Sequence, residues 1–456
     1  MLDPITAFIE AASVPLDSGH ASGTLDRAQS ILAEHPEVAS SSIYTAAILG
    51  DAEGVGHFLA RDPAAATAKG GPRDWDPLTY LSFSRYLRLD RERSDGFLRT
   101  AAALLDAGAS ANTGWLERNH QPKPEWESVI YGAAGVAHHA ELTRLLLERG
   151  ADPNDEETPY HAPEGYDNAA LKVLVESGKL TDDSLTTILL RKTDWHDHDG
   201  IKWLLDQGLD PNRTGRWGKT ALHNSVLRDN DLVIIEALLD HGADPTIIAI
   251  HPGRGMGGSE RQSAIAIAAR RGRSDVLELF EKRGFPTALE GVGRLSAACA
   301  RNDDTAIRSI VDHDPQLVSE LVADGGRLIA AFSGVENTSG VRQLLDLGVD
   351  VKTLFKEGDA YFGIAPDSMA IHVAAWRANH ETVKLLIERG SPVDVPDGKG
   401  RTPLALAVKA CVDSYWTRRR SPDSVEALLS AGARVSAVKF PSGYAEVDAL
   451  LRSYQS

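Results

Sequence analysis

The chain has 456 residues and a formal net charge of −17, with 65 Asp and Glu residues against 48 Lys and Arg residues. This balance argues against general affinity for nucleic acid, which needs clustered cations to neutralise phosphates. Its two cysteines, Cys299 and Cys411, are too few for a disulfide framework or a cysteine-based metal knuckle, and they fit a reducing cytoplasm best.

Hydropathy gives no sign of targeting or of a membrane span. No basic segment precedes the short apolar run at the N-terminus, so we expect no signal peptide. No run of about 18 consecutive apolar residues occurs, so we expect no membrane-spanning helix.

The first predicted element is a helix that begins near Asp3 and carries an apolar stripe as far as Ala12. Proline in its first turn is typical of a helix start, because the amide that proline lacks has no partner there. We interpret residues 1–21 as an N-terminal capping helix and linker. Residues 24–63 then predict an outer helix followed by a pair of helices.

The clearest copy of a repeated pattern spans residues 369–401. A run of small residues is followed by a turn, a second apolar stripe and then Gly390. Apolar residues at i, i+3 and i+4 mark one face of a helix, and glycine just past the stripe suits a left-handed cap. The pattern predicts a helix, a turn, a second helix and a loop.

The residue that ends the second helix recurs along the chain. From His35 to Gly432 there are 397 residues and eleven intervals, which average about 36 residues each. A period in this range with paired helices indicates a solenoid, in which each repeat contacts only its neighbours. The aligned positions are His35, Asp62, Gly108, Gly150, Gly178, Gly208, Gly242, Gly284, Asp314, Gly348, Gly390 and Gly432.

Short motifs open and close these repeats. Thr220-Ala221-Leu222-His223 opens one, and Gly242-Ala243-Asp244-Pro245 closes it; residues 158–161, 402–407 and 149–154 carry related motifs. These residues resemble the ankyrin repeat, whose unit is about 33 residues long and opens with T-P-L-H-x-A.

The resemblance covers residues 22–438 and implies an all-α ankyrin-repeat solenoid. We expect about twelve helix-turn-helix repeats, with extended loops and a C-terminal capping helix in residues 439–456.

Several repeats depart from the pattern. Long loops are predicted at residues 112–128 and 353–368, and insertions in repeat arrays collect on one face, often the binding face. Pro163 is expected to break the helix in which it falls. The glycine-rich segment 251–259 matches no phosphate-binding motif, so we interpret it as a flexible loop tip.

A basic residue follows the first helix in many repeats. Such a ladder of cations along one groove attracts an anionic partner such as an acidic peptide. Alternatively, each cation offsets the dipole at the C-terminal end of a short helix. The residues are Arg85, His138, Lys192, Arg228, Arg270, Arg301, Arg377 and Lys409.

Aromatic residues concentrate in the first half of the array, where six of the eight tryptophans lie. Rigid aromatic side chains dominate binding energy at recognition sites, although some of these must pack in the core. Together with nearby cations they form our predicted binding set, to which no catalytic residue is assigned. The set is Trp75, Tyr80, Arg85, Tyr86, Trp115, Trp126, Tyr131, His138, Tyr160, Tyr166, Lys192, Trp195 and Arg228.

Residues 194–199 contain two histidines and three aspartates. Both residue types can bind metals or transfer protons. Their spacing does not place them on one helix face, and no H-E-x-x-H motif occurs, so we expect neither a metal site nor a cofactor. His161, His223 and His372 match the ankyrin T-x-L-H histidine, which in that family bonds backbone of neighbouring repeats.

We interpret the chain as a cytoplasmic binding scaffold. Its concave groove and long loops would hold a protein or peptide partner, one with an acidic surface, and neither nucleic acid nor a membrane. The alternative is an enzyme, a hydrolase or lyase acting on a small or sugar-like substrate in the loop-enclosed groove of the N-terminal half. That alternative requires a deep cavity with two carboxylates, or a histidine and a carboxylate, within proton-transfer reach.

Overall fold

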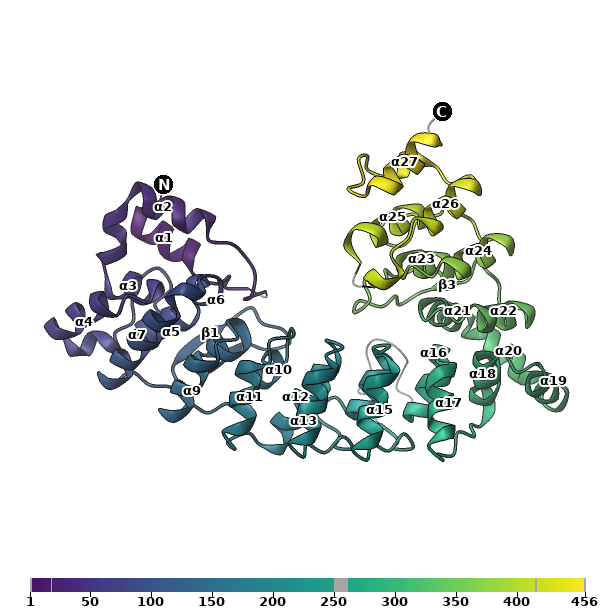
Figure 1. The fold of residues 1–456 in the computed structure, drawn as a ribbon, viewed down its shortest axis with the longest axis horizontal. Helices are drawn as coiled ribbons and strands as arrows, with labels where there is room; N and C mark the ends of the chain where they lie inside the picture. The colour runs from purple at the N-terminus through teal and green to yellow at the C-terminus, as the bar shows by residue number, and fades with distance from the viewer. Residues whose placement is uncertain (1, 18, 250–260, 415, 455–456) are drawn as a thin grey trace. The chain divides into compact units, whose positions relative to one another are not determined.

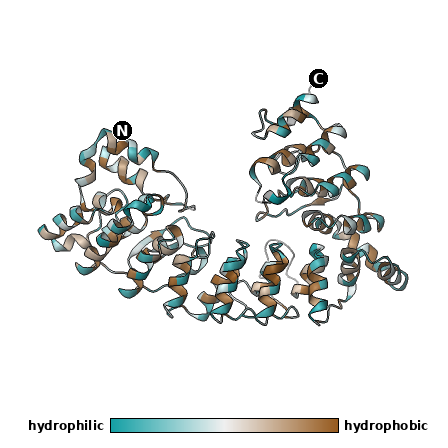
Figure 2. Cartoon of the chain, viewed as in Figure 1, coloured by the Kyte–Doolittle hydropathy of each residue, from teal (hydrophilic) through white to brown (hydrophobic). Residues whose placement is uncertain are grey.

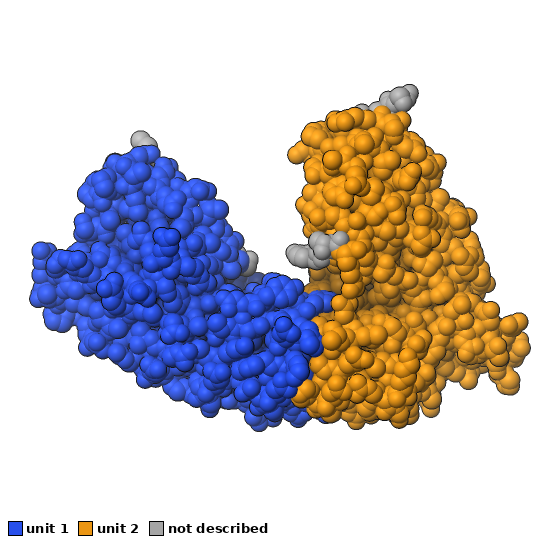
Figure 3. All heavy atoms as spheres, in the orientation of Figure 1, with its two compact units in different colours: residues 1–216 blue, residues 217–456 orange. Residues whose placement is uncertain are grey.

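The computed structural model describes residues 2–17, 19–249, 261–414 and 416–454. They divide into two compact units, which we call unit 1 (residues 1–216) and unit 2 (residues 217–456), coloured separately in Figure 3. Each unit is a stack of helix pairs, as the solenoid prediction requires (Figure 1). The glycine-rich segment 251–259 lies outside the described residues.

Unit 1 begins with the predicted capping helix and contains one β-hairpin. Its elements are α1 (Pro4–Ala12), α2 (Asp26–Glu34), η1 (Pro36–Ser40), α3 (Ile43–Leu49), α4 (Ala52–Arg61), η2 (Pro63–Ala66), α5 (Pro77–Ser82), α6 (Arg85–Leu89), η3 (Arg91–Arg93), α7 (Ser94–Asp106), β1 (Gly114–Glu117), β2 (Glu125–Ser128), α8 (Val129–Tyr131), η4 (Gly132–Val136), α9 (Ala140–Glu148), α10 (Glu157–His161), α11 (Ala169–Glu176), α12 (Asp182–Thr193) and α13 (His198–Asp206).

Unit 2 ends with a helix, α27, within residues 439–456, where the C-terminal capping helix is predicted. Its elements are α14 (Ala221–Leu227), α15 (Leu232–Asp240), α16 (Ala264–Arg271), α17 (Ser274–Lys282), α18 (Gly291–Arg301), α19 (Asp304–His313), α20 (Gln316–Ala323), α21 (Gly325–Gly334), α22 (Thr338–Asp346), β3 (Leu354–Phe355), β4 (Ser368–Met369), α23 (Ala370–Trp376), α24 (His380–Glu388), α25 (Pro403–Asp413), η5 (Thr417–Arg419), α26 (Asp423–Ser430), η6 (Val435–Ala437) and α27 (Ala445–Ser453).

The first helices of the repeats begin at side chains that cap them. Thr220 accepts a hydrogen bond from the amide of His223, and Thr402 accepts one from the amide of Ala405. Asp76 does the same for Thr79 at the start of α5. Such a cap satisfies an amide that has no partner within the helix and stabilises it by about 1 kcal/mol.

The second helices end as predicted, in two ways. Nine glycines at the aligned positions have φ between 66° and 102°, a left-handed conformation in which a Cβ is strained. His35, Asp62 and Asp314 instead have φ of −135°, −146° and −146°, and a proline follows each. Proline restricts the residue before it to such extended backbone, so these three ends need no glycine. The nine glycines are Gly108, Gly150, Gly178, Gly208, Gly242, Gly284, Gly348, Gly390 and Gly432.

Within each unit, like helices pack on like helices. First helices contact first helices, as α3 with α5 and α21 with α23, and second helices contact second helices, as α7 with α9 and α24 with α26. Hydrophobic residues gather on the faces where these helices meet (Figure 2). Surface ion pairs join neighbouring second helices at one recurring spacing of 43 residues: Arg149 with Asp106, Arg283 with Asp240, and Arg389 with Asp346.

The long loop predicted at residues 112–128 contains a β-hairpin that the sequence analysis missed. Strands β1 and β2 pair antiparallel, with Leu116 opposite Trp126. Trp115 and Glu117 of β1 are buried, whereas Leu116 between them is 44% exposed, as expected for a strand with one face on the core. Helix α10 has only five residues and ends before Pro163, as predicted.

None of the described helices combines the length and the apolar character needed to cross a membrane.

Candidate binding cleft

Four aromatic residues of the predicted binding set lie together in the core of unit 1. Trp75, Tyr80, Trp115 and Tyr131 are 4%, 0%, 6% and 3% exposed. The ring centroids of Trp75 and Trp115 are 5.0 Å apart, and Phe83 packs edge-on against both Trp115 and Tyr131. These side chains therefore hold the hairpin against Trp75 and Phe83, which flank α5, and have almost no surface to offer a partner.

Three further members of the predicted set have structural contacts. Tyr86 is buried against Phe8, with ring centroids 6.4 Å apart. Arg85 donates a hydrogen bond to the carbonyl of Ala11, which joins α6 to α1. Lys192 is fully buried and lies 2.8 Å from the carboxylate of Asp197. Burial lowers the pKa of Lys192, although this ion pair opposes the shift.

The histidine-aspartate stretch at residues 194–199 has a structural role, which centres on Asp197. Its carboxylate caps α13 by accepting from the amide of Gly200, and it also pairs with Lys192 and Asn168. His196 is exposed and has a φ of 53°, so it forms the turn between α12 and α13. The stretch is therefore a helix-helix turn with a capping aspartate.

The remaining members of the set are more accessible. Trp126 is 42% exposed and Tyr166 is 70% exposed, while His138 and Trp195 are half-buried. The guanidinium of Arg191 lies 3.9 Å from the ring centre of half-buried Tyr160. Arg228 belongs to unit 2, where its guanidinium lies 3.9 Å from the ring centre of Tyr361. Trp126 and Tyr166 are the members with most surface for a partner.

The three histidines of the repeat motif have different roles. Nε2 of His223 lies 3.1 Å from the carbonyl oxygen of Ile247, and Nε2 of His372 lies 2.8 Å from that of Val395. These contacts join neighbouring repeats, as the resemblance implies. His161 instead lies between two carboxylates, 3.1 Å from Glu157 and 2.9 Å from Glu164.

The pKa of His161 predicts how stability in this region depends on pH. Burial opposes protonation, but the hydrogen bonds to Glu157 and Glu164 prevail and raise the pKa to about 9. This stabilisation is complete below the unfolded value of about 6.5 and is lost as pH rises through about 9. We expect a loss of roughly 1–3 kcal/mol, because the side chain is partly exposed.

Thermal unfolding of the full chain between pH 6 and pH 10 measures this loss, with His161→Asn as the reference. The wild-type midpoint is expected to fall more steeply with rising pH than the variant midpoint, because Glu127, whose pKa is also raised to about 9, contributes the same slope to both proteins. Parallel pH profiles for the two proteins would contradict the assignment.

The predicted ladder of cations is largely paired within the chain. Arg270 pairs with Asp324 at 2.7 Å, Arg301 with Glu281 at 2.6 Å and Lys409 with Asp413 at 2.7 Å. Arg377 pairs with Asp229 at 3.1 Å. These ion pairs stabilise the repeat array. A distinct site forms where several of the cations lie close together.

Such a convergence occurs in unit 2, around a cleft of about 60 Å³. Four arginines and one aspartate line it: Arg270 and Arg271 end α16, Arg327 lies in α21, Arg377 follows α23, and Asp359 comes from the inserted segment 353–368. The same segment supplies an apolar side made of Phe355, Phe362 and Ile364.

Beside the cleft, Asp229 holds two of its arginines in place. Its carboxylate accepts two hydrogen bonds from Arg271, at 2.6 and 2.7 Å, and one from Arg377 at 3.1 Å. Asp229 has a φ of 54°, a conformation that Asp and Asn adopt more readily than most residues. Burial would raise the pKa of Asp229, but the two guanidinium groups outweigh it and lower the pKa.

Aromatic rings cover the Arg377 guanidinium. Its central carbon lies 4.1 Å from the ring centre of Phe362 and 4.4 Å from that of Trp416. Burial lowers its pKa to about 10, with Asp229 opposing the shift, so the group stays charged at neutral pH. Nε of Arg377 is buried and has no hydrogen-bond partner among the described residues.

On the other side of the cleft, Asp324 joins the arginines of two helices. Its carboxylate lies 2.7 Å from Arg270 and 2.8 Å from Arg327. The side chains of both arginines are partly exposed, at 22% and 29% respectively, so a ligand can reach them. Sequence reasoning named Arg270 and Arg377 but missed Arg271, Arg327 and Asp359. The long insertion at residues 353–368 was the sequence feature that could have pointed to this cleft.

Comparisons with known proteins agree with the repeat pattern. The family model for ankyrin repeats (3 copies) matches residues 193–288 and 328–439. Serine/threonine-protein kinase TNNI3K of Mus musculus is 32% identical over 84 residues, which are 18% of this chain and 10% of that protein. Serine/threonine-protein kinase 12 of Arabidopsis thaliana is 32% identical over 85 residues, or 19% of this chain and 17% of that protein.

Two further similarities extend over more of the chain. Human transient receptor potential cation channel subfamily A member 1 is 23% identical over 299 residues, 59% of this chain and 24% of that protein. The chain thus spans less than a quarter of each of these three curated relatives. Among solved structures, the human ASB11 ankyrin repeat domain is 19% identical, with 54% of this chain and 98% of that chain covered and a TM-score of 0.23.

Proposed function

Because this chain is an ankyrin-repeat protein, we propose that it is an interaction scaffold whose arginine-lined cleft in unit 2 holds an acidic segment of a partner protein. Stacked repeats present an extended surface for binding, and the inserted segment 353–368 adds an apolar side to the cleft. We propose the cytoplasm as its compartment, since Cys299 and Cys411 are free thiols.

The observation that carries this proposal is the excess of arginine over aspartate in the cleft lining. Four arginines and one aspartate line it, and Asp229 and Asp324 beside it pair with these arginines, so the cations exceed the carboxylates by one (4 − 3 = 1) in a chain whose formal net charge is −17. Guanidinium groups bind carboxylates through planar, paired hydrogen bonds, and a local positive surface on an acidic protein selects acidic partners.

The size of the cleft limits what enters it. A single water needs roughly 10–15 Å³ of such space, so a cleft of about 60 Å³ admits the carboxyl end of an Asp or Glu side chain. Phe355 and Phe362 provide an apolar contact beside it. We therefore expect a partner segment in which an acidic residue stands next to an apolar one.

Selection from a displayed library of random peptides tests this function on the full-length protein. We expect enrichment of Asp and Glu among the binders, and an affinity that falls as NaCl concentration rises. The double variant Arg270→Ala/Arg327→Ala is expected to bind the selected peptides at least about tenfold more weakly.

A matched control removes two arginines elsewhere in unit 2. Arg283 and Arg389 are also partly exposed, and each pairs with an aspartate of the preceding second helix. Arg283→Ala/Arg389→Ala changes the net charge equally and is expected to leave peptide affinity within about twofold. Binders without acidic residues, or equal losses in both double variants, would contradict the proposed function.

One observation supports the alternative of an enzyme in the N-terminal half, but the groups concerned are too deeply buried for a substrate to reach them. His20, Glu117 and Glu127 bring a histidine and two carboxylates together, but they are only 6%, 3% and 0% exposed. A sugar-like substrate cannot reach groups buried to this extent without displacing the chain around them. We therefore favour the scaffold.

A further inference from the structure

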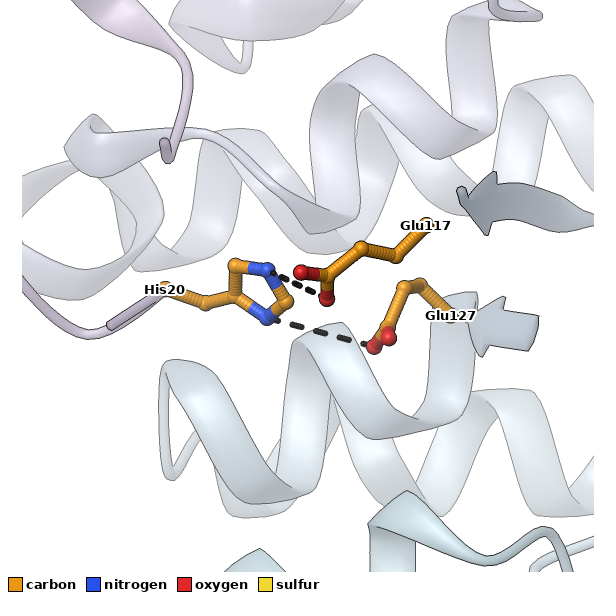
Figure 4. A group of neighbouring side chains, drawn as sticks. All are labelled: His20, Glu117 and Glu127. Atoms are coloured by element: carbon orange, nitrogen blue, oxygen red, sulfur yellow. Dashed lines mark ion pairs between the residues drawn. The ribbon is translucent and has the colours of Figure 1, made fainter. Parts of the chain in front are cut away.

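Three buried side chains from distant parts of unit 1 meet at one point (Figure 4). His20 lies between α1 and α2, Glu117 ends β1, and Glu127 belongs to β2. One nitrogen or oxygen atom from each residue lies within 4.8 Å of the other two. The hairpin thus carries its two inward-facing carboxylates to the histidine of the N-terminal segment.

Hydrogen bonding within this group is incomplete. Nδ1 of His20 lies 2.9 Å from the hydroxyl of Tyr131, whereas its Nε2 has no hydrogen-bond partner among the described residues. Neither carboxylate oxygen of the fully buried Glu127 has such a partner among them. A buried carboxylate without partners costs several kcal/mol, so the group calls for a bound cation or proton.

We propose that His20, Glu117 and Glu127 bind a divalent transition-metal ion of the Zn²⁺ class. Ligands placed tetrahedrally at about 2.0–2.2 Å from zinc lie roughly 3.3–3.6 Å from one another. Nε2 of His20 and Oε2 of Glu117 already lie 3.3 Å apart. One nitrogen and two carboxylates suit Zn²⁺, whereas Mg²⁺ and Ca²⁺ prefer oxygen ligands alone.

The surroundings of the group favour this assignment. The hydroxyl of Tyr131 lies 2.9 Å from Nδ1 of His20, and a metal-binding histidine is oriented by such a hydrogen bond at its other nitrogen. Nε2 faces Glu117 at 3.3 Å, whereas Oε2 of Glu127 lies 3.9 Å from Nδ1, so binding at Nε2 requires the Glu127 side chain to turn toward Glu117 (Figure 4). Trp115 and Tyr131 lie against the imidazole, with ring centroids 5.5 and 5.9 Å away, and make an apolar wall beside the group. A fourth position remains for a water molecule or a second oxygen of a carboxylate.

The pKa values of His20 and Glu127 are consistent with metal binding. Burial lowers the pKa of His20 to about 4, so the imidazole is neutral and can coordinate at neutral pH. Burial and the neighbouring carboxylates Glu157 and Glu117 raise the pKa of Glu127 to about 9. The bound ion would tie the N-terminal segment to the hairpin.

Zinc uptake by the full-length protein tests the proposal. After dialysis against a chelator, the protein is titrated with ZnCl₂ alone in a calorimeter, and bound zinc is counted by mass spectrometry after gel filtration. We expect one high-affinity Zn²⁺ per chain and a thermal midpoint that rises with zinc. Glu127→Gln is expected to weaken binding roughly 100-fold or more.

Glu125→Gln is the matched control, because Glu125 lies on the same strand and pairs with Lys123 outside the group. It is expected to bind zinc like the wild type. His20→Gln is a second variant in a loop, so the test survives if Glu127→Gln fails to fold. Uptake that is absent in the wild type, or equal in the wild type and in the folded variants of His20 or Glu127, would overturn the proposal and leave a shared proton as the occupant.

Discussion

Replacing Asp229 with Asn is expected to lower the free energy of unfolding of unit 2 by about 3–5 kcal/mol. The side chains of Asp229, Arg271 and Arg377 are only 6%, 10% and 5% exposed. The substitution removes the carboxylate and leaves two buried guanidinium groups without their counter-charge. Asn has nearly the same shape and tolerates the positive φ of this position, so the loss reports the charge itself.

Urea unfolding, followed by hydrogen exchange of peptides from residues 221–240 and 370–388, measures this loss. Asp231→Asn is the control, because Asp231 pairs with Arg418 on the surface, where the two side chains are 58% and 65% exposed. We expect the control to cost less than about 0.5 kcal/mol. Equal and small losses in the two variants would show that the buried pair contributes no stability.

The effect of Asp229→Asn should also depend on pH. The two arginines lower the pKa of Asp229 in the folded chain, so its stabilising contribution is present above the unfolded value of about 3.9. That contribution is lost as pH falls through the lower, folded value. The stabilities of wild type and variant should therefore converge in strong acid, where the carboxyl group is protonated.

The second large effect is expected for Trp115→Ala, which should destabilise unit 1 by about 3–5 kcal/mol. Trp115 is 6% exposed and contacts Trp75, Phe83 and His20 with ring centroids 5.0–5.9 Å apart. Truncation leaves a cavity among rings that cannot all move to fill it. The hairpin would also lose its ring contacts with Trp75 and Phe83, which flank α5.

Trp126→Ala provides a control with the same chemistry on the paired strand. Trp126 lies opposite Leu116 in the hairpin and is 42% exposed, so its truncation is expected to cost less than about 1 kcal/mol. Urea midpoints and hydrogen exchange of residues 113–131 compare the two variants. A larger loss in Trp126→Ala than in Trp115→Ala would contradict the observed register of the hairpin.

The repeat architecture was predictable because its signals are local. A glycine with positive φ or a residue before proline ends each second helix, and both are visible within a few residues of sequence. The hairpin was not predictable in the same way. Each strand has only four residues, the connection contains Pro122 and Pro124, and its inward face packs on residues far away in sequence.

The candidate sites depend on contacts between residues that are far apart in the sequence. Aromatic residues concentrate in unit 1, as the sequence indicates, but composition does not distinguish a binding surface from a core, and Trp75 and Trp115 belong to the core. Arg377 meets Asp229 across 148 residues. His20 meets Glu117 across 97 residues, since 117 − 20 = 97. A local motif search finds neither pair.

The most direct test of the account is an experimental structure of the full-length protein bound to the tightest acidic peptide from the selection. We predict a peptide carboxylate within hydrogen-bonding distance of both Arg270 and Arg327, the two partly exposed arginines of the cleft, with an apolar neighbour against Phe362. A peptide seated away from this cleft, with its acidic side chains in solvent, would contradict the account.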